Sequence, residues 1–213
     1  MTRQTLRQGL LRSRLEVQPR WDRVLHTQNR CAPTRYLYAG GHTAEVFKVM
    51  DALDHARYQP RSFVAAATDR LAATKVQQHE QKWASSTEAD AALSATLRVI
   101  PRSREVGQSW VTSAVTTAWA AVFSLRVLLL DRPHLVLANG PGTCLPLCLL
   151  AQALRMLGLL NCRVVFVESI ARTRRLSMTG RILYTLRAAD KLFVQWQPLA
   201  ERFPRSLCAG RVY

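Results

Sequence analysis

The fold is decided by the stretch Leu135-Val136-Leu137-Ala138-Asn139-Gly140-Pro141-Gly142-Thr143-Cys144. Its first four residues are apolar on both faces, which is typical of a strand buried in a parallel sheet. The asparagine, glycines and proline that follow favour a turn, and an apolar helical pattern starts at Cys144. This order of strand, turn and helix indicates an α/β protein.

The same unit recurs along the chain from Tyr36 onward, with short β-rich runs alternating with longer helical patterns. Such alternation predicts a Rossmann-like parallel sheet with flanking helices, and we expect one domain over residues 35–213. The predicted strands are Tyr36–Ala39, Ser62–Ala67, Thr96–Ile100, Leu135–Ala138, Val164–Val167 and Leu192–Gln195. The predicted helices are Thr43–Ala56, Leu71–Lys82, Ser109–Leu130, Cys144–Leu157 and Ser177–Leu186.

The composition is that of a globular and strongly basic protein. Hydrophobic residues make up 48% of the 213 residues, which is enough to build a core. A formal net charge of +16 favours an anionic partner such as phosphate, anionic lipid or nucleic acid. Because no recognised nucleic-acid-binding module accompanies the charge, we expect no nucleic-acid partner.

The five cysteines include no CxxC pair. Their spacing therefore suggests neither a disulfide framework nor a structural zinc site, and a reducing compartment is the simpler expectation. Cys144 and Cys148 lie one helical turn apart, but no third ligand is near them in sequence, so core packing is favoured. We expect no metal and no cofactor.

Two apolar runs approach the length of a membrane-spanning helix, which needs about 20 residues. Ala114–Leu130 is interrupted by an arginine, and Leu145–Leu160 by a glutamine and an arginine, so both are interpreted as partly buried or interfacial helices. Trp110 and Trp119 fit a helix that rests on lipid or on a partner, and core burial explains them equally well. Residues 1–34 form a basic extension with seven arginines, expected to be disordered, a membrane-surface helix or a transit-like leader.

The turn after the first predicted strand reads Gly40-Gly41-His42-Thr43. Two glycines allow backbone N–H groups to approach a ligand at a helix N-terminus, an arrangement that suits a phosphate. The alternative is an ordinary turn in which Thr43 caps the helix and Glu45 lies near the positive end of its dipole. His42 is then either a chemical group of the site or a helix-start residue bonded to backbone.

Other strand ends carry polar residues that would face the same crevice, since open α/β sheets bind ligands beyond the carboxyl ends of their strands. The turn Asn139–Thr143 is rich in backbone donors, although Asn139 and Pro141 are also ordinary turn formers. Glu168-Ser169 ends the fifth predicted strand, and its carboxylate can orient a sugar hydroxyl or act as a base.

Arginines gather in the loops after the third and fifth predicted strands. Guanidinium groups grip pyrophosphate well, although a solvated face explains such a run equally well. These arginines are Arg102, Arg104, Arg172, Arg174 and Arg175.

Together these motifs resemble the Alg14 family, the membrane-recruiting subunit of the UDP-N-acetylglucosamine transferase of dolichol-linked oligosaccharide synthesis. The resemblance covers residues 36–213, and the number of separate motifs in matching order makes it specific. The segments that carry it are Gly40–Glu45, Tyr58–Arg61, Thr68-Asp69, Ile100–Trp110, Asn139–Cys144, Val167–Ser169, Leu176–Gly180, Val194–Trp196 and Gly210–Val212.

The resemblance implies a split glycosyltransferase of the GT-B fold and of the EC 2.4.1 class. This chain would be the N-terminal, acceptor-side half, and an ALG13-type catalytic subunit would bind UDP-N-acetylglucosamine, with neither half active alone. The heterodimer would add the second N-acetylglucosamine to dolichyl-diphosphate-N-acetylglucosamine, with inversion, at the cytosolic face of the endoplasmic reticulum membrane. The nuclear membrane and the first mannosyltransferase of the same pathway are implied as a further location and a further partner.

The resemblance also suggests roles for individual residues. His42 is the general base or orients the acceptor, and Glu168 is the competing candidate. The tail Gly210, Arg211, Val212 and Tyr213 docks into the catalytic partner. The acceptor diphosphate is held by Gly40, Gly41, Thr43, Arg102, Arg104, Asn139, Gly140, Gly142 and Thr143.

A second hypothesis makes the chain a non-catalytic membrane adaptor. It would recruit and activate the catalytic subunit and leave all chemistry to that partner. Both hypotheses predict complex formation. They differ in whether changes at His42 or Glu168 spare the complex and yet abolish turnover.

Overall fold

The computed structural model describes residues 35–40, 43–51, 53, 58, 60–69, 71–84, 95–103, 108–140, 142–208 and 210. The described strands are β1 (Tyr36–Gly40), β2 (Arg61–Ala66), β3 (Thr96–Ile100), β4 (Leu135–Asn139), β5 (Arg163–Val167), β6 (Lys191–Val194) and β7 (Leu207–Cys208). The described helices are α2 (Thr43–Met50), α3 (Ala72–Ala84), α4 (Trp110–Asp131), α5 (Cys144–Met156), α6 (Met178–Thr185) and α7 (Gln197–Arg202).

The strands form one parallel sheet in the order β3-β2-β1-β4-β5-β6-β7. The chain moves outward from β1 to β3 and then returns to add β4 on the other side of β1. This reversal is the topological switch point of a doubly wound sheet. The predicted Rossmann-like fold is therefore confirmed.

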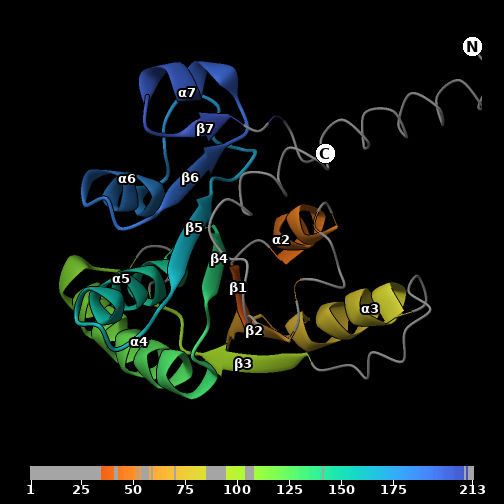
Figure 1. Cartoon of the computed structure of the whole chain (residues 1–213). Helices are drawn as coiled ribbons and strands as arrows, with labels where there is room; N and C mark the ends of the chain where they lie inside the picture. Colours follow the sequence, from red (N-terminus) through yellow and green to blue (C-terminus); the bar gives the residue numbers. More distant parts are fainter. Residues whose placement is uncertain are drawn as a thin grey trace, which may run out of the picture.

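Helices cover both faces of the sheet (Figure 1), and the pleat divides the core between them. Leu37 of β1 packs in a buried cluster with side chains of α4, α5 and α6. Its neighbour Tyr38 points to the other face and joins a second cluster with α2 and α3. Successive side chains of a strand face opposite ways, so a strand buried on both faces must be apolar throughout, as the sequence of β4 is.

The boundaries differ from the sequence prediction in a few places. All six predicted strands are present, with ends within one residue of those predicted. The first helix ends at Met50 rather than at Ala56, because the chain turns at residues 51 and 53. Helix α7 and strand β7 were not predicted. The basic extension of residues 1–34 lies outside the described residues.

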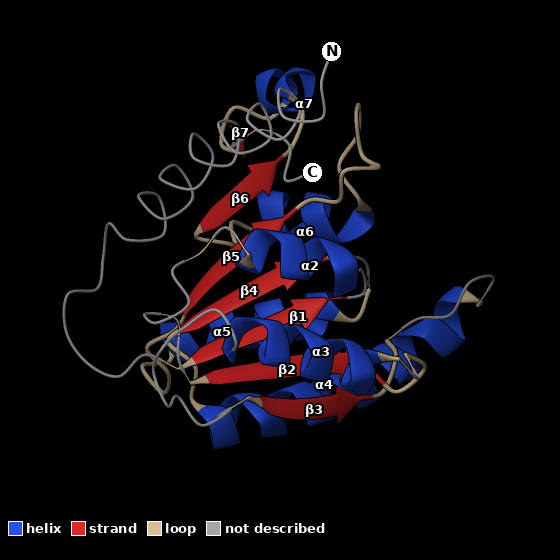
Figure 2. Ribbon diagram, turned by 90° about the vertical axis from the view of Figure 1, so that its right-hand side faces the viewer, coloured by secondary structure: helices blue, strands red, loops and turns tan. Residues whose placement is uncertain are grey.

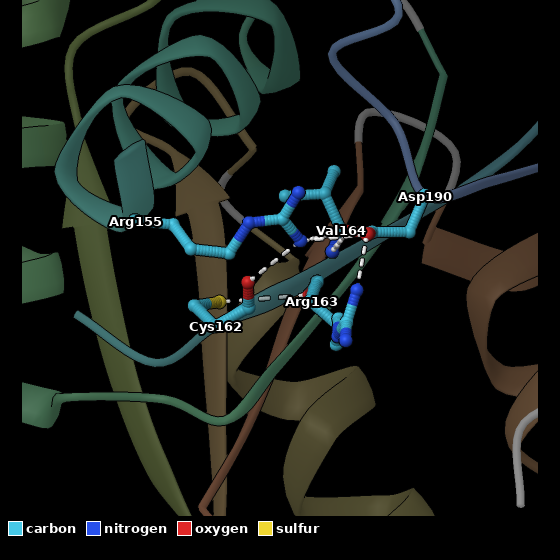
Figure 3. Close-up of polar contacts among 5 residues, drawn as sticks. All are labelled: Arg155, Cys162, Arg163, Val164 and Asp190. Atoms are coloured by element: carbon cyan, nitrogen blue, oxygen red, sulfur yellow. Dashed lines mark hydrogen bonds and ion pairs between the residues drawn. The ribbon is translucent and has the colours of Figure 1, made fainter. Parts of the chain in front are cut away.

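An ion cluster ties α5 to β5 and β6 at the amino edge of the sheet (Figure 3). Asp190 accepts hydrogen bonds from Arg155 at 2.6 Å, from Arg163 at 2.9 Å and from the backbone N–H of Val164 at 2.8 Å. Burial alone would raise the pKa of Asp190, but these hydrogen bonds outweigh it and lower the pKa. A second buried pair, Arg61 with Glu80 at 2.7 Å, joins the start of β2 to α3. Both clusters lie away from the carboxyl ends of the strands.

Candidate functional site

The predicted site lies where the parallel strands end. β1 ends at Gly40, β4 at Asn139 and β5 at Val167, and the register places Gly40 beside Asn139 and Asn139 beside Val167. The arrowheads of these strands lie at one edge of the sheet (Figure 2). The loops that follow β1, β4 and β5 therefore share the carboxyl edge at the switch point, where this class of fold binds ligands.

The turn after β4 depends on two glycines with positive φ. Gly140 has φ 97° and Gly142 has φ 43°, a region that favours glycine. The Gly142 N–H donates to Thr179 Oγ1 at 3.2 Å, and a Cβ at this position would lie 3.2 Å from Ser103 Oγ. The turn is thus packed between the loop after β3 and the start of α6. Thr143 lies at the first turn of α5, where its side chain makes no capping hydrogen bond.

Glu168 follows β5 and is buried, with 1% of its surface exposed. Its Oε2 accepts hydrogen bonds from the Ser177 N–H at 2.8 Å and from Ser177 Oγ at 3.0 Å, and its Oε1 accepts one from the Ser169 N–H at 3.2 Å. Ser177 is the N-cap of α6 and accepts a hydrogen bond from the Gly180 N–H at 3.0 Å. Burial raises the pKa of Glu168, against the opposing effect of these hydrogen bonds. The carboxylate therefore organises the loop that leads into α6.

A second buried carboxylate joins the start of α2 to the end of β4 and to the loop after β5. Glu45 on α2 accepts hydrogen bonds from Ser169 Oγ at 2.8 Å and from Asn139 Nδ2 at 3.1 Å. Asn139 Nδ2 also donates to the Val167 carbonyl at 3.1 Å. Glu45, Asn139 and Ser169 are 9%, 1% and 7% exposed. We call these three residues the switch-point network.

The neighbours of Asn139 fix which way its amide faces. The Glu45 carboxylate and the Val167 carbonyl are both acceptors, so the Nδ2 group must be the atom that faces them. Asn139 Oδ1 is then left buried, and it has no hydrogen-bond partner among the described residues. Ser103 Oγ, next to Gly142, is likewise buried and has no hydrogen-bond partner among the described residues. Buried polar atoms of this kind call for a partner such as a water or a ligand.

Exposed arginines lie in the loops that adjoin this buried cluster. Arg102 is exposed in the loop after β3, and Arg172, Arg174 and Arg175 are exposed in the loop before α6. Their loops are anchored by backbone carbonyls: Thr116 Oγ1 donates to Ser103 O at 2.8 Å, and Trp196 Nε1 donates to Ile170 O at 2.7 Å. The site thus combines a buried polar floor with a cationic rim.

The structure brings together part of the predicted site. Gly40 ends β1, Thr43 begins α2, and the turn residues Asn139, Gly140, Gly142 and Thr143 lie at the same edge as Glu168. Gly210 is described, with φ 82°. The predicted roles of these residues stay predictions. Those of Gly41, His42, Arg104, Arg211, Val212 and Tyr213 concern residues outside the described part of the chain.

Sequence reasoning missed the part that Glu45 plays. Its position in the first turn of a helix gave it an ordinary interpretation as a residue that favours the helix dipole. Its partners lie 94 and 124 residues further along the chain, so no local pattern connects them. Within the described residues, no group of three or more His, Cys, Asp or Glu side chains is arranged to hold a metal ion.

The strand order defines a doubly wound α/β protein, and the polar residues at its switch point form a candidate ligand site at the carboxyl edge of the sheet. Comparison with known families makes this more specific. The family model "Oligosaccharide biosynthesis protein Alg14 like" matches residues 36–212. The chain belongs to the Alg14 family.

Similar proteins are found in animals and fungi. The chain is 41% identical over 174 residues to the UDP-N-acetylglucosamine transferase subunit ALG14 of Rattus norvegicus, covering 82% of this chain and 79% of that protein. The corresponding Yarrowia lipolytica protein is 38% identical over 168 residues, covering 79% of this chain and 74% of its own. Among solved structures, MurG of Acinetobacter baumannii aligns over 76% of this chain and 41% of its own, with 15% identity and a TM-score of 0.48.

Proposed function

We propose that this chain is the acceptor-side subunit of a UDP-N-acetylglucosamine transferase, and that it recruits this enzyme to the membrane. The observation that carries the proposal is the similarity of four fifths of the chain to proteins named as subunits of that transferase. More specifically, the complex adds the second N-acetylglucosamine to dolichyl-diphosphate-N-acetylglucosamine at the cytosolic face of the endoplasmic reticulum. An ALG13-type subunit binds the UDP-sugar, and the two chains are active only together.

The chemistry requires a base for the acceptor hydroxyl. A base must come within hydrogen-bond reach of the proton that it removes. The Glu168 carboxylate is buried and already accepts hydrogen bonds from Ser169 and Ser177, which supports a positioning role more than a basic one. We therefore assign the role of general base to His42. Glu168 instead holds the loop that leads into α6.

The acceptor diphosphate needs donors and positive charge. Backbone N–H groups of the two glycine turns and the start of α5 can supply donors, and Thr143 adds a hydroxyl at the same edge. The Nδ2 group of Asn139 already donates to Glu45 and Val167, so its free Oδ1 can accept from a sugar hydroxyl rather than bind the phosphate. The exposed guanidinium groups of Arg102 and of the loop before α6 can neutralise the diphosphate. This division between a buried floor and a cationic rim suits a ligand with an anionic head and a sugar.

Helix α4 offers the surface for membrane contact. Its segment Thr112–Asp131 is long and apolar enough to cross a membrane, with 28% of its most apolar window buried. One side packs into the core cluster through Val127 and Leu128, while Trp119 and Val122 are 58% and 59% exposed. We propose that this exposed side rests on the bilayer, because a helix packed along the sheet on one side is not free to span it.

The test is reconstitution of the pair. The full chain is co-expressed with a candidate ALG13-type subunit, and transfer from UDP-N-acetylglucosamine to a lipid-diphosphate-linked N-acetylglucosamine is measured. Activity in the pair and in neither chain alone is expected; a fully active partner on its own would overturn the split-enzyme proposal.

Point variants separate the proposed enzyme half from the adaptor. His42→Ala should leave co-purification intact and lower turnover by roughly 100-fold or more, as loss of a general base does. Glu168→Ala should reduce activity together with the stability of the α6 loop. If both variants assemble and turn over normally, the chain is an adaptor and the assigned roles are wrong.

A further inference from the structure

We propose that Glu45 is a positioning residue of the acceptor site. Its carboxylate holds the side chains of Asn139 and Ser169 and so fixes the start of α2, the end of β4 and the loop after β5 in one arrangement. The inference rests on the proposed function, because the acceptor whose binding it affects comes from there. Neither the family resemblance nor the predicted site gave Glu45 such a role.

The geometry of the switch-point network is specific. The two oxygens of Glu45 accept hydrogen bonds from different segments: Oε1 from Ser169 after β5, and Oε2 from Asn139 at the end of β4. Glu45 itself lies on the helix that follows β1. One carboxylate therefore connects α2 to the ends of β4 and β5, and a shift of any one of these segments would break a hydrogen bond to another.

The network also carries an energetic cost, because it buries a carboxylate. Among the described residues, no lysine or arginine forms a salt bridge with Glu45; the ion pairs of this part of the chain involve Asp51, Glu80, Asp131 and Asp190. In the described part of the chain, its support consists of two neutral donors and the positive end of the α2 dipole, and burying a carboxylate on such support is costly. Proteins keep such departures mainly at functional sites. The position of this one, at the switch point, agrees with that reading.

Loss of Glu45 would affect two groups that face the proposed acceptor site. The Asn139 amide would keep only the Val167 carbonyl as its acceptor, so the direction of its unpartnered Oδ1 would be less well defined. Ser169 would lose its acceptor, and its Oγ also receives a hydrogen bond from the Ala171 N–H at 3.3 Å. The start of the loop that carries Arg172 would therefore loosen as well.

The experiment uses the reconstituted complex with the catalytic partner. The variants are Glu45→Ala, Glu45→Gln, Ser169→Ala and the double variant Glu45→Ala/Ser169→Ala. Glu80→Gln is the matched control, because Glu80 is a glutamate with 3% of its surface exposed, against 9% for Glu45, and it pairs with Arg61 at the amino end of β2, away from the site. Each complex is measured for co-purification, thermal midpoint, kcat, and KM for the lipid acceptor and for UDP-N-acetylglucosamine. Hydrogen exchange is followed at residues 140–143 and 168–172.

For Glu45→Ala we expect KM for the lipid acceptor to rise, or kcat to fall, by roughly 10-fold or more, as misplacement of a site does. KM for UDP-N-acetylglucosamine should not change, since that sugar binds the partner. Glu45→Gln should be milder, because its oxygen can still accept from Asn139 while its amide donates to Ser169 Oγ. The double variant should be little worse than Glu45→Ala, since both changes remove the same interaction. Glu80→Gln should alter the thermal midpoint alone.

The proposal is overturned if the Glu45→Ala complex assembles and keeps its kinetic constants, or if it changes both KM values equally. It is also overturned if hydrogen exchange rises no more at residues 140–143 and 168–172 than in Glu80→Gln. Should Glu45→Ala fail to assemble, Glu45→Gln and Ser169→Ala are judged by the same criteria. If the wild-type pair transfers no sugar, the proposed function fails, and hydrogen exchange alone then decides whether Glu45 holds the loops.

Discussion

Glu168, Ser177 and Gly180 form one packed unit in which a buried carboxylate shapes the start of α6. A Cβ built at residue 180 would collide with Glu168 Oε2 and would press on Ser177 Oγ. The absence of a side chain at this position is what lets the carboxylate approach the helix end. The two predictions at this scale test the steric and the electrostatic parts of the unit.

Gly180→Ala should destabilise the chain, although alanine is the better helix former. Overpacking of this kind costs about 1–3 kcal/mol, which exceeds the gain in helix propensity of about 1 kcal/mol. Urea unfolding of the full chain measures the difference. Thr185→Ala, at an exposed position of the same helix, is the control and should have little effect. A Gly180→Ala chain as stable as the wild type would contradict the contact with Glu168.

The raised pKa of Glu168 predicts a pH dependence with a definite sign. Above its ordinary pKa of 4.5, the unfolded chain releases the proton first, while the folded, buried group keeps it. The protonated Glu168 therefore adds its full contribution to the free energy of unfolding below pH 4.5. This contribution is lost as the pH rises through the pKa that the group has in the folded chain. Glu168→Gln cannot titrate. The stability difference, wild type minus Glu168→Gln, should therefore fall with rising pH.

Urea unfolding of both chains at pH values on either side of 4.5 measures this difference, in which other titrating groups cancel. A difference that rises with pH would mean that the hydrogen bonds from Ser177 and Ser169 outweigh burial and that the folded pKa is lowered. A flat difference would mean that Glu168 has the same pKa in both states.

At the scale of the elements, the long apolar runs were predictable and the short ones were not. A strand such as β4 can be predicted from its unbroken apolar run, and helix α4 can be predicted from the length of its apolar run. Helix α7 spans six residues and β7 two, too few to show a period. Both depend on tertiary support, since Leu199 of α7 is fully buried in the core and β7 pairs with β6.

In the candidate site, too, local features could be predicted from the sequence, while interactions between distant residues could not. The glycine turns and the residues just after each strand could be predicted, because the chain direction in a parallel sheet sends all strand ends to one edge. The switch-point network could not, because its bonds join residues far apart in sequence. Likewise the sequence placed the Glu168 carboxylate at the strand end, but it did not indicate that this carboxylate accepts hydrogen bonds from Ser177, the N-cap of α6.

The exposed side of α4 leads to a prediction about membrane binding. Val115, Trp119 and Val122 follow one another at helical spacing on this side, and each is more than half exposed. Trp119→Ser/Val122→Ser should lower binding to vesicles containing phosphatidylserine by roughly 10-fold, because two large apolar groups no longer enter the interface. Co-sedimentation of the full chain with vesicles measures this.

Ala118→Ser, also at an exposed position of α4, is the matched control and should bind normally. Arg126→Ala should weaken binding to phosphatidylserine vesicles at low salt only, since an exposed charge acts through the screened surface potential. If the double variant binds vesicles as well as the wild type, then membrane contact lies elsewhere in the chain and α4 is free to meet a protein.

At the scale of the whole molecule, this chain is one of the two subunits of the proposed enzyme, and its C-terminal tail is the predicted contact with the catalytic subunit. The tail Gly210–Tyr213 was predicted to dock into the catalytic partner, and it follows the edge strand β7. Deletion of Arg211–Tyr213 should abolish co-purification with the partner. The fold should survive, because the buried clusters on both faces of the sheet are formed by residues 36–199.

Pull-down of the tagged full chain measures the loss of the partner, and circular dichroism with urea unfolding checks the fold of the shortened chain. Phe203→Ala is the comparison, because it removes a partly buried side chain near the C-terminus, where it packs on Tyr184 at 5.2 Å between ring centroids. It should lower stability by about 3 kcal/mol at most, since the side chain is only partly buried, and yet keep the partner. If the shortened chain still co-purified, the docking surface would have to lie on the sheet or its helices, and the tail would have no part in assembling the enzyme.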